Sequence, residues 1–374
     1  MSNSISLEST PAQIELVKAM ASNDAVKAIA AQEAFALKAG EVIQTVINKA
    51  PTISNLFKDW AFDKYSNPSI PLDLFYDVKE TDYVRVWQQS MPGGLPYNEV
   101  HGINELKVST YELYSAVAFL KKFAAQGNVN IVAKTLNRMA QEFLVKRDNN
   151  AAFVLLTALA QASTTVNGVA KKHVIRANSA GNLTLDDFLA MFELNARIMS
   201  AWNGGTPVFG ADNLTDLIVS PEGIRKLRQM AFNPVNTAGT LTNIPATDSL
   251  REELYRSAGA LSFYGVSIHQ MQELGVGYPY NTLFAAAAGS TTFPGYGTGG
   301  AAAAFNPATE QIAIGINANI DGLWRPVANE NGGGQVTVTP DDQFVRRQGK
   351  IGYYATLEEG YVVTDARQLA GLIW

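Results

Sequence analysis

Apolar residues recur at roughly helical intervals near the start of the chain. From Pro11 to about Asn48 the sequence is rich in Ala, Lys, Glu and Gln, and its spaced apolar residues are Leu16, Met20, Val26 and Ile29. Such residues tolerate a helix well, and the spacing gathers the apolar ones on one side. The pattern predicts one or two amphipathic helices.

A second helical pattern occupies residues 129–147, where one face carries Val132, Leu136, Met139 and Phe143. We expect Asp148-Asn149-Asn150 to end this helix before another apolar helix over 151–162. A shorter helix is expected just upstream. Ser109 or Thr110 would cap it and Gly127-Asn128 would end it, and its common face would carry Leu113, Val117 and Leu120.

Between these helical regions the chain alternates extended pieces with turn-forming residues. We expect extended pieces over 74–78, 83–90 and 97–108, the last two forming a long hairpin. The turn-rich tip of this hairpin consists of Met91, Pro92, Gly93, Gly94, Leu95 and Pro96. Polar residues along both arms prevent the hairpin from forming its own core, so it should project and rest on another surface through that tip.

An aromatic segment precedes the hairpin, between Pro51 and Pro71. It contains Leu56, Phe57, Trp60, Phe62 and Tyr65, followed by Asn67-Pro68 and Ile70-Pro71. The prolines prevent a continuous helix. We interpret the segment as an arm that lies across something else.

The second half of the chain alternates helices and strands. Ser220-Pro221 supplies a cap and a first-turn proline to a helix over 222–230. Further helices are expected over 185–202 and 249–260, and strands over 217–219, 263–271, 311–316 and 350–358, with a Gly/Ala-rich insertion before 311. Together with the predicted hairpin, this order indicates an α+β protein.

The composition of the chain excludes several classes of function. The chain has 374 residues, of which 47% are hydrophobic and only 17% charged, against a usual charged share of about a quarter. Its net charge of −5 is unlike the basic footprint of a protein that grips nucleic acid. Without any cysteine it has no disulfide, thiolate metal site or Cys nucleophile. Residues 1–25 do not have the pattern of a secretory signal, and no apolar run is long enough for a membrane span, so we expect an intracellular, soluble protein.

Candidate chemistry is sparse. The three histidines, His101, His173 and His269, belong to different predicted elements, and none has the neighbours of a zinc site. Gly295-Tyr296-Gly297-Thr298-Gly299-Gly300 formally matches the dinucleotide-binding pattern, with Asp321 downstream. It lacks a preceding strand, and Pro307 stops the following Ala run, so we interpret it as a flexible surface loop. We therefore expect no catalytic, cofactor-binding or metal-binding residues and no enzyme activity.

The order of elements resembles that of the HK97-like major capsid proteins of tailed bacteriophages. The likeness covers roughly residues 70–374 and is carried by five stretches of sequence. Glu105–Leu113 resembles the exit from the E-loop, Val129–Arg147 the spine helix, Leu217–Leu227 a strand and helix of the A-domain, and Gln343–Ala355 with Glu359–Leu369 the closing strands.

The resemblance implies a capsid fold with five parts. These are an N-terminal arm with a helical segment (1–70), an extended E-loop hairpin (71–108), a P-domain with a long spine helix (109–165), a mixed α/β A-domain (166–334), and closing strands that return through the P-domain to the A-domain (335–374). Each hairpin would lie over a neighbouring subunit, and the arm would reach another.

The resemblance also implies a structural role. Copies of the chain would form hexamers and pentamers of an icosahedral head, assembled in the host bacterial cytoplasm. The virion shell would enclose double-stranded DNA without sequence-specific binding or a membrane, aided by portal, scaffold or decoration proteins. An encapsulin-like protein container of the same fold and an enzyme with an unrecognised site are the alternatives.

Some members of the family lock their shells by a Lys–Asn isopeptide bond. Here Lys79 and Lys107 lie near the hairpin base, Asn329 and Asn331 lie before the closing strands, and residues 83–106 contain no Lys. A lysine at the base cannot reach the subunit that the tip reaches. No crosslink is expected.

Overall fold

The computed structural model describes residues 10–50, 52–64, 66–71, 105–166, 168–178, 181–199, 213–232, 262–263, 265–295, 301–329, 335–341 and 348–374. The hairpin tip 91–96, both hairpin arms up to residue 104, and the helix expected over 249–260 lie outside these residues. The chain divides into two compact units. The first comprises 1–69, 107–151 and 324–362, and the second comprises 70–106, 152–323 and 363–374. Helices and sheets occur in both, which confirms the α+β class.

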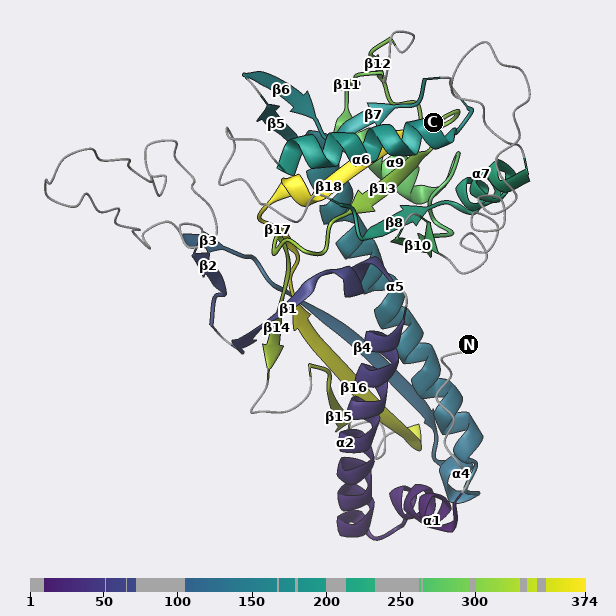
Figure 1. Cartoon of the computed structure of the whole chain (residues 1–374). Coiled ribbons are helices and arrows are strands. Elements are labelled where there is room, and N and C mark those ends of the chain that lie inside the picture. The colour runs from purple at the N-terminus through teal and green to yellow at the C-terminus, as the bar shows by residue number, and fades with distance from the viewer. Residues whose placement is uncertain are drawn as a thin grey trace, which may run out of the picture. The chain divides into compact units, whose positions relative to one another are not determined.

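The first unit packs helices on one face of a sheet (Figure 1). Its helices are α1 (Pro11–Met20), α2 (Ala25–Lys49), α4 (Lys121–Ala125) and α5 (Val129–Gln161), the last continuing into the second unit. The helical region expected from Pro11 to about Asn48 is therefore confirmed, and it consists of the two helices α1 and α2. The Asp24 carboxylate accepts a hydrogen bond from the Val26 N–H at 3.1 Å and so caps α2.

The sheet of this unit is built around β16 (Lys350–Glu359). Along one edge β16 pairs with β4 (Tyr111–Leu120) in antiparallel register from Lys350 opposite Leu120 to Glu359 opposite Tyr111. The remaining strands are β15 (Thr337–Asp341), β14 (Leu323–Asn329), β17 (Val362–Val363) and β1 (Lys58–Asp63). As expected, Ile351, Tyr353, Ala355 and Leu357 of β16 are buried; they share one core with α2 and α5.

The helix predicted between Thr110 and Gly127 is wrong over most of its length, because residues 111–120 form β4 and only Lys121–Ala125 are helical. Leu113 and Phe119 point into the core, while Tyr114 and Leu120 are exposed, which is a strand's period of two. The full-length pairing with β16 provides hydrogen-bond partners for backbone N–H and C=O groups that a helix would otherwise pair internally. The expected stop is present after α4, where Gly127 adopts a φ of 69°.

The predicted break at Asp148-Asn149-Asn150 was also wrong, because α5 runs unbroken through these residues. Short polar side chains usually disrupt helices by bonding to nearby backbone. Here the Asp148 carboxylate instead accepts a hydrogen bond from the Ser54 N–H at 3.3 Å. The expected apolar face of Val132, Leu136, Met139 and Phe143 is buried.

The described part of the predicted arm pairs with a strand of the same chain. After a short 3-10 helix, η1 (Ile53–Leu56), strand β1 pairs in parallel with β14, from Lys58 opposite Trp324 to Asp63 opposite Asn329. Further on, β2 (Ser69–Pro71) and β3 (Glu105–Lys107) form a two-stranded sheet. The two ends of the predicted hairpin are thus held side by side.

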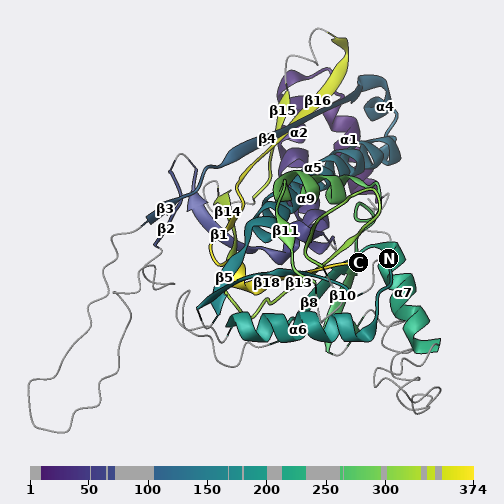
Figure 2. The same ribbon diagram turned by 90° about the horizontal axis from the view of Figure 1, so that it is seen from above.

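The second unit has a mixed six-stranded sheet with α6 (Leu185–Met199) lying along it (Figure 2). The strand order is β7 (Val174–Arg176), β18 (Leu369–Ile373), β13 (Ile312–Ile316), β8 (Asp216–Val219), β10 (Val266–Gln270) and β9 (Ser262–Phe263). Helix α7 (Pro221–Phe232) starts as expected, because the Ser220 hydroxyl accepts a hydrogen bond from the Gly223 N–H at 3.1 Å. Two small ribbons complete the unit, β5 (Ser163–Val166) with β6 (Val169–Lys172), and β11 (Thr292–Phe293) with β12 (Ala303–Ala304).

The Gly/Ala-rich insertion contains a helix that the sequence pattern did not predict. Helix α9 (Pro279–Ala288) has Pro279 at its first position and ends at Gly289, whose φ is 56°. Proline is favoured at that start and alanine is the best helix former, so the run Ala285–Ala288 extends the helix.

Candidate functional site

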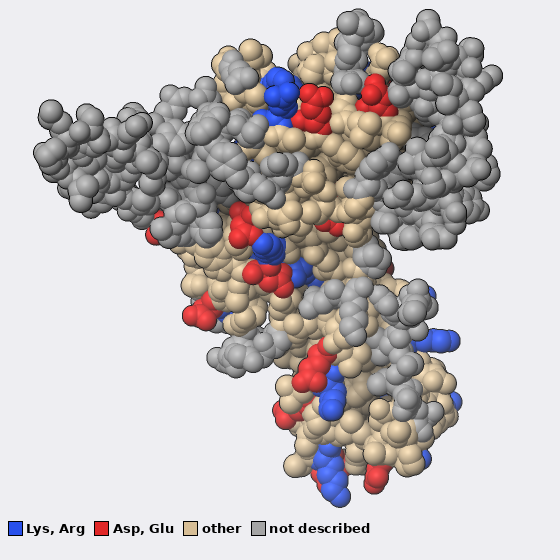
Figure 3. Space-filling view, viewed as in Figure 1, with Lys and Arg blue, Asp and Glu red and all other residues tan. Residues whose placement is uncertain are grey.

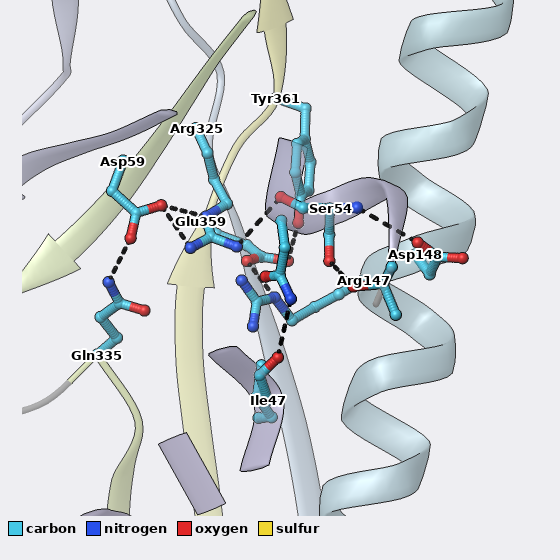
Figure 4. A network of polar contacts seen from close by, with 11 residues as sticks. Ile47, Ser54, Asp59, Arg147, Asp148, Arg325, Gln335, Glu359 and Tyr361 are labelled. Carbon is cyan, nitrogen blue, oxygen red and sulfur yellow. Dashed lines mark hydrogen bonds and ion pairs between the residues drawn. The ribbon is translucent and has the colours of Figure 1, made fainter. Parts of the chain in front are cut away.

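The most unusual chemistry in the first unit is a buried ion pair between Arg147 of α5 and Glu359 at the end of β16. The Arg147 Nε lies 3.0 Å from Glu359 Oε2, and the two side chains are 1% and 0% exposed. The Tyr361 hydroxyl donates to the other carboxylate oxygen at 3.3 Å. Two full charges and a phenol are thus removed from water together (Figure 4).

A second buried arginine, Arg325 of β14, ties the arm to this network. Its Nε donates to Asp59 of β1 at 2.6 Å, and its Nη1 donates to the Ser54 carbonyl at 3.3 Å. Asp59 also accepts from the Gln335 amide at 2.9 Å. The network therefore joins segments that are far apart in sequence, namely η1 and β1, α5, β14, and the end of β16.

Burial dominates the electrostatics of the network. Desolvation raises the pKa of Glu359 above its usual range, although Arg147 and Arg325 oppose this shift. The pKa of Tyr361 and that of Tyr111 are raised for the same first reason, with the Glu359 charge adding to the effect. Both phenols therefore stay protonated. Arg147, Glu359 and Tyr361 form the buried part of the network and have a structural role, whereas Asp59 at its edge is 41% exposed.

His173 also has a structural environment, in the second unit. It is 1% exposed, and its Nδ1 lies 2.8 Å from the Ala366 carbonyl and 3.1 Å from that of Leu369. Since carbonyls only accept, Nδ1 carries the proton and Nε2 accepts from the Thr164 hydroxyl at 2.8 Å. Burial lowers the pKa of His173. Through these hydrogen bonds the imidazole ring links Ala366 and Leu369, before and at the start of β18, to Thr164 of β5.

The structure gives His269 a carboxylate partner that its sequence neighbours did not reveal. Its Nε2 lies 2.8 Å from Asp216 Oδ1, because β10 and β8 are adjacent parallel strands. This bond lowers the pKa of Asp216. The Thr215 hydroxyl donates to the same carboxylate at 2.7 Å and not to the imidazole. A nucleophile would need the imidazole as its base, so this trio is not a hydrolase triad.

Within the described ranges no cluster of three or more His, Asp or Glu side chains could hold a metal ion. Among the same residues no helix is long and apolar enough to cross a membrane. On the face seen in Figure 3, most of the described surface is uncharged, and the charged side chains of both signs are scattered rather than gathered. Of the glycine-rich match, Gly295 is described and 296–300 are not.

The candidate contact residues Met91, Pro92, Gly93, Gly94, Leu95 and Pro96 lie outside the described residues, as does His101. Conversely, the buried ion network was not predicted from the sequence. A usable signal was present, since Arg325 interrupts the apolar run Leu323–Val327 within a strand. A lone charge in such a run is buried only when it is paired.

Comparison with known proteins finds similarity in architecture and not in sequence. No family model matches the chain, and no curated protein matches it. Among solved structures, the capsid of the cyanophage P-SCSP1u is 15% identical, with 85% of this chain and 86% of that chain covered and a TM-score of 0.43. The capsid of a native GTA particle is 10% identical, with 87% and 90% covered and a TM-score of 0.48. The SrpI encapsulin complex of Synechococcus elongatus is 11% identical, with 85% of each chain covered and a TM-score of 0.44.

Proposed function

We propose that this chain is a shell-forming structural protein that assembles with copies of itself. Two observations carry the proposal. The 33-residue helix α5 packs on strands β4 and β16, and the paired β2 and β3 bring together the two ends of the segment 72–104. This is the order of spine helix, closing strand and projecting hairpin that the sequence resemblance implies.

The more specific proposal is the head shell of a tailed phage that encloses double-stranded DNA. The net charge of −5 supports it, because a negative wall contains packed DNA without binding it tightly. Within this proposal the first unit supplies the P-domain, the second supplies the A-domain, and hairpin tips meet neighbouring subunits. Portal, scaffold or decoration proteins would be further partners. An encapsulin-like container is the alternative of the same fold.

Light scattering and electron microscopy of the purified full chain test the proposal. Closed particles of uniform size are expected, and a monomer or small oligomer at all concentrations would contradict a shell. The ratio of absorbance at 260 and 280 nm of particles from infected or expressing cells then separates the two shells. Nucleic acid inside supports the phage head, and a protein cargo supports the container.

A further inference from the structure

A groove lies beside the β5–β6 ribbon in the second unit. Strand β6 forms one wall, α6 and β7 line it further, and the chain around β11 and β12 forms the other wall (Figure 1). Its volume is about 560 Å³, which leaves room for several side chains of a ligand. The buried Ile175 and Ala190 and the half-buried Leu194 give this β6 groove an apolar floor.

The wall made by β6 is the free edge of a strand. All four residues of β6, 169–172, line the groove although their side chains alternate between two faces, which places the backbone edge on the groove. In an antiparallel ladder, backbone groups point alternately toward and away from the partner strand. The His173 N–H donates to the Ala162 carbonyl at 3.3 Å and so fixes this alternation for β6 and β5. The N–H and C=O groups of Ala170 and Lys172 therefore point away from β5, and no described strand pairs with that edge.

The charged residues that line the groove are mostly cationic. They are Lys171, Lys172 and Arg197, with Glu193 as the one carboxylate among the described lining residues. Glu193 already lies 3.8 Å from Arg197, one helical turn away on α6. No ion pair joins either lysine to a described carboxylate. The groove is thus a local positive site on a chain with a net charge of −5, and it is complementary to acidic ligands.

We propose that the β6 groove binds an extended, acidic segment of a partner protein, which adds a strand to the free edge of β6. The main chain of this segment pairs with the outward backbone groups of Ala170 and Lys172. Its alternate apolar side chains pack on the floor around Ile175 and Leu194, and the carboxylates between them meet Lys171 and Lys172. The inference goes beyond the proposed self-assembly and does not depend on it, since a single chain supplies every residue of the groove.

A nucleic acid fits the groove less well than such a segment. Phosphates would use the lysines, but a phosphate backbone pairs with neither the strand edge nor the apolar floor. An extended peptide uses the strand edge, the floor and the cations together.

A fluorescent peptide tests the proposal with the full chain. The probe is Ser-Glu-Val-Asp-Val-Glu-Val-Ser, blocked at both ends, and its anisotropy should show saturable binding that weakens as salt is raised. Two further peptides carry N-methyl groups, one on the valines and one on the acidic residues. They keep the side chains and charges but each loses the backbone donors along one edge. The peptide that lacks the donors facing β6 should bind about tenfold more weakly or worse.

Charge reversal tests the same contact from the side of the protein. Lys171→Glu/Lys172→Glu should weaken peptide binding about tenfold or more, because attraction becomes repulsion. Arg225→Glu/Arg228→Glu changes the net charge equally at exposed positions of α7 that do not line the groove, and it should bind the peptide like the wild type. Melting temperatures equal to that of the wild type show that both variants are folded.

A backbone variant separates strand addition from charge attraction. Ala170→Pro removes an outward N–H that β5 does not use, and proline is tolerated at such edge positions. It should weaken peptide binding several-fold while leaving every charge in place.

Three results would overturn the proposal. The first is no binding of the acidic peptide to the wild type, or equal binding of all the peptides and variants. The second is tighter binding of single-stranded oligothymidine than of the peptide, which would assign the lysines to phosphate. The third is self-association of the wild type that Lys171→Glu/Lys172→Glu abolishes, which would make a second copy of this chain the occupant.

Discussion

Arg147 and Glu359 face each other at 3.0 Å across the core of the first unit, one from the middle of α5 and the other from the last residue of β16. Neither charge contacts water, so each depends on the other for its electrostatic stabilisation. Removing one leaves a buried charge without its partner, which costs far more than the pair itself contributes.

Arg147→Met should therefore lower the free energy of unfolding of the unassembled subunit by about 3–5 kcal/mol in urea titrations. Arg147→Met/Glu359→Gln should recover most of this loss, because the Gln side chain is neutral and still accepts from Tyr361. Lys146→Met, at the exposed neighbouring position, is the control and should change stability by less than about 0.5 kcal/mol. A loss below about 1 kcal/mol for Arg147→Met would show that the pair is not sealed from water.

His173 should make the second unit less stable in mild acid. Burial holds the pKa of His173 below its ordinary value of 6.5, whereas the unfolded chain takes up the proton near 6.5. The contribution is complete above that pH and declines as the pH falls toward the lower folded-state pKa. The melting temperature should thus fall between pH 7.5 and 5.5 in the wild type and fall less in His173→Asn. Equal pH dependence in the two proteins would contradict this assignment.

The hairpin tip should act between subunits. Replacing residues 89–97 by a short Gly/Ser turn should leave a folded subunit with an unchanged melting temperature that forms particles poorly, since Met91 and Leu95 would lose an apolar site on a neighbour. Met91→Ser/Leu95→Ser keeps the length of the hairpin and should have the same effect. Normal particles from both variants, by light scattering, would refute a role for the tip in assembly.

The shell should contain no covalent bonds between subunits. Lys107 ends β3 and Asn329 ends β14, whereas Lys79 and Asn331 lie outside the described residues. The hairpin itself offers no lysine between 83 and 106. Particles boiled in detergent and reductant should give a single band at 40.3 kDa. A ladder of multiples of that mass on the gel is the contrary result.

Local patterns predicted helices and strands well where the spacing of apolar residues or a capping motif was unambiguous. The buried face of α5 and the cap of α7 are examples. Leu113, Val117 and Leu120 fit a helix, but Leu113, Val117 and Phe119 fit a strand equally well, and the sequence around them does not decide. Pairing with β16, more than two hundred residues later, decides for the strand. Tertiary partners also explain why α5 continues through Asp148.

The buried network could not be predicted from local sequence patterns for the same reason, because its partners come from distant segments. Asp59, Arg147, Arg325 and Glu359 are ordinary charges in their own segments, which are far apart in the sequence apart from the last two. Only the parallel pairing of β1 with β14 and the packing of α5 on β16 bring them together. A lone charge within an apolar strand run, as at Arg325, predicts that a partner exists but not which residue it is.

The central position of β16 also sets the time at which the first unit can fold. Its neighbours β4, β14 and β15 have no common strand to pair with until residues 350–359 have been synthesised, near the end of the chain. Closing so long a loop is slow, since its entropy is lost before the pairing is gained. A chain that stops before residue 350 therefore lacks the strand that joins β4, β14 and β15 into one sheet.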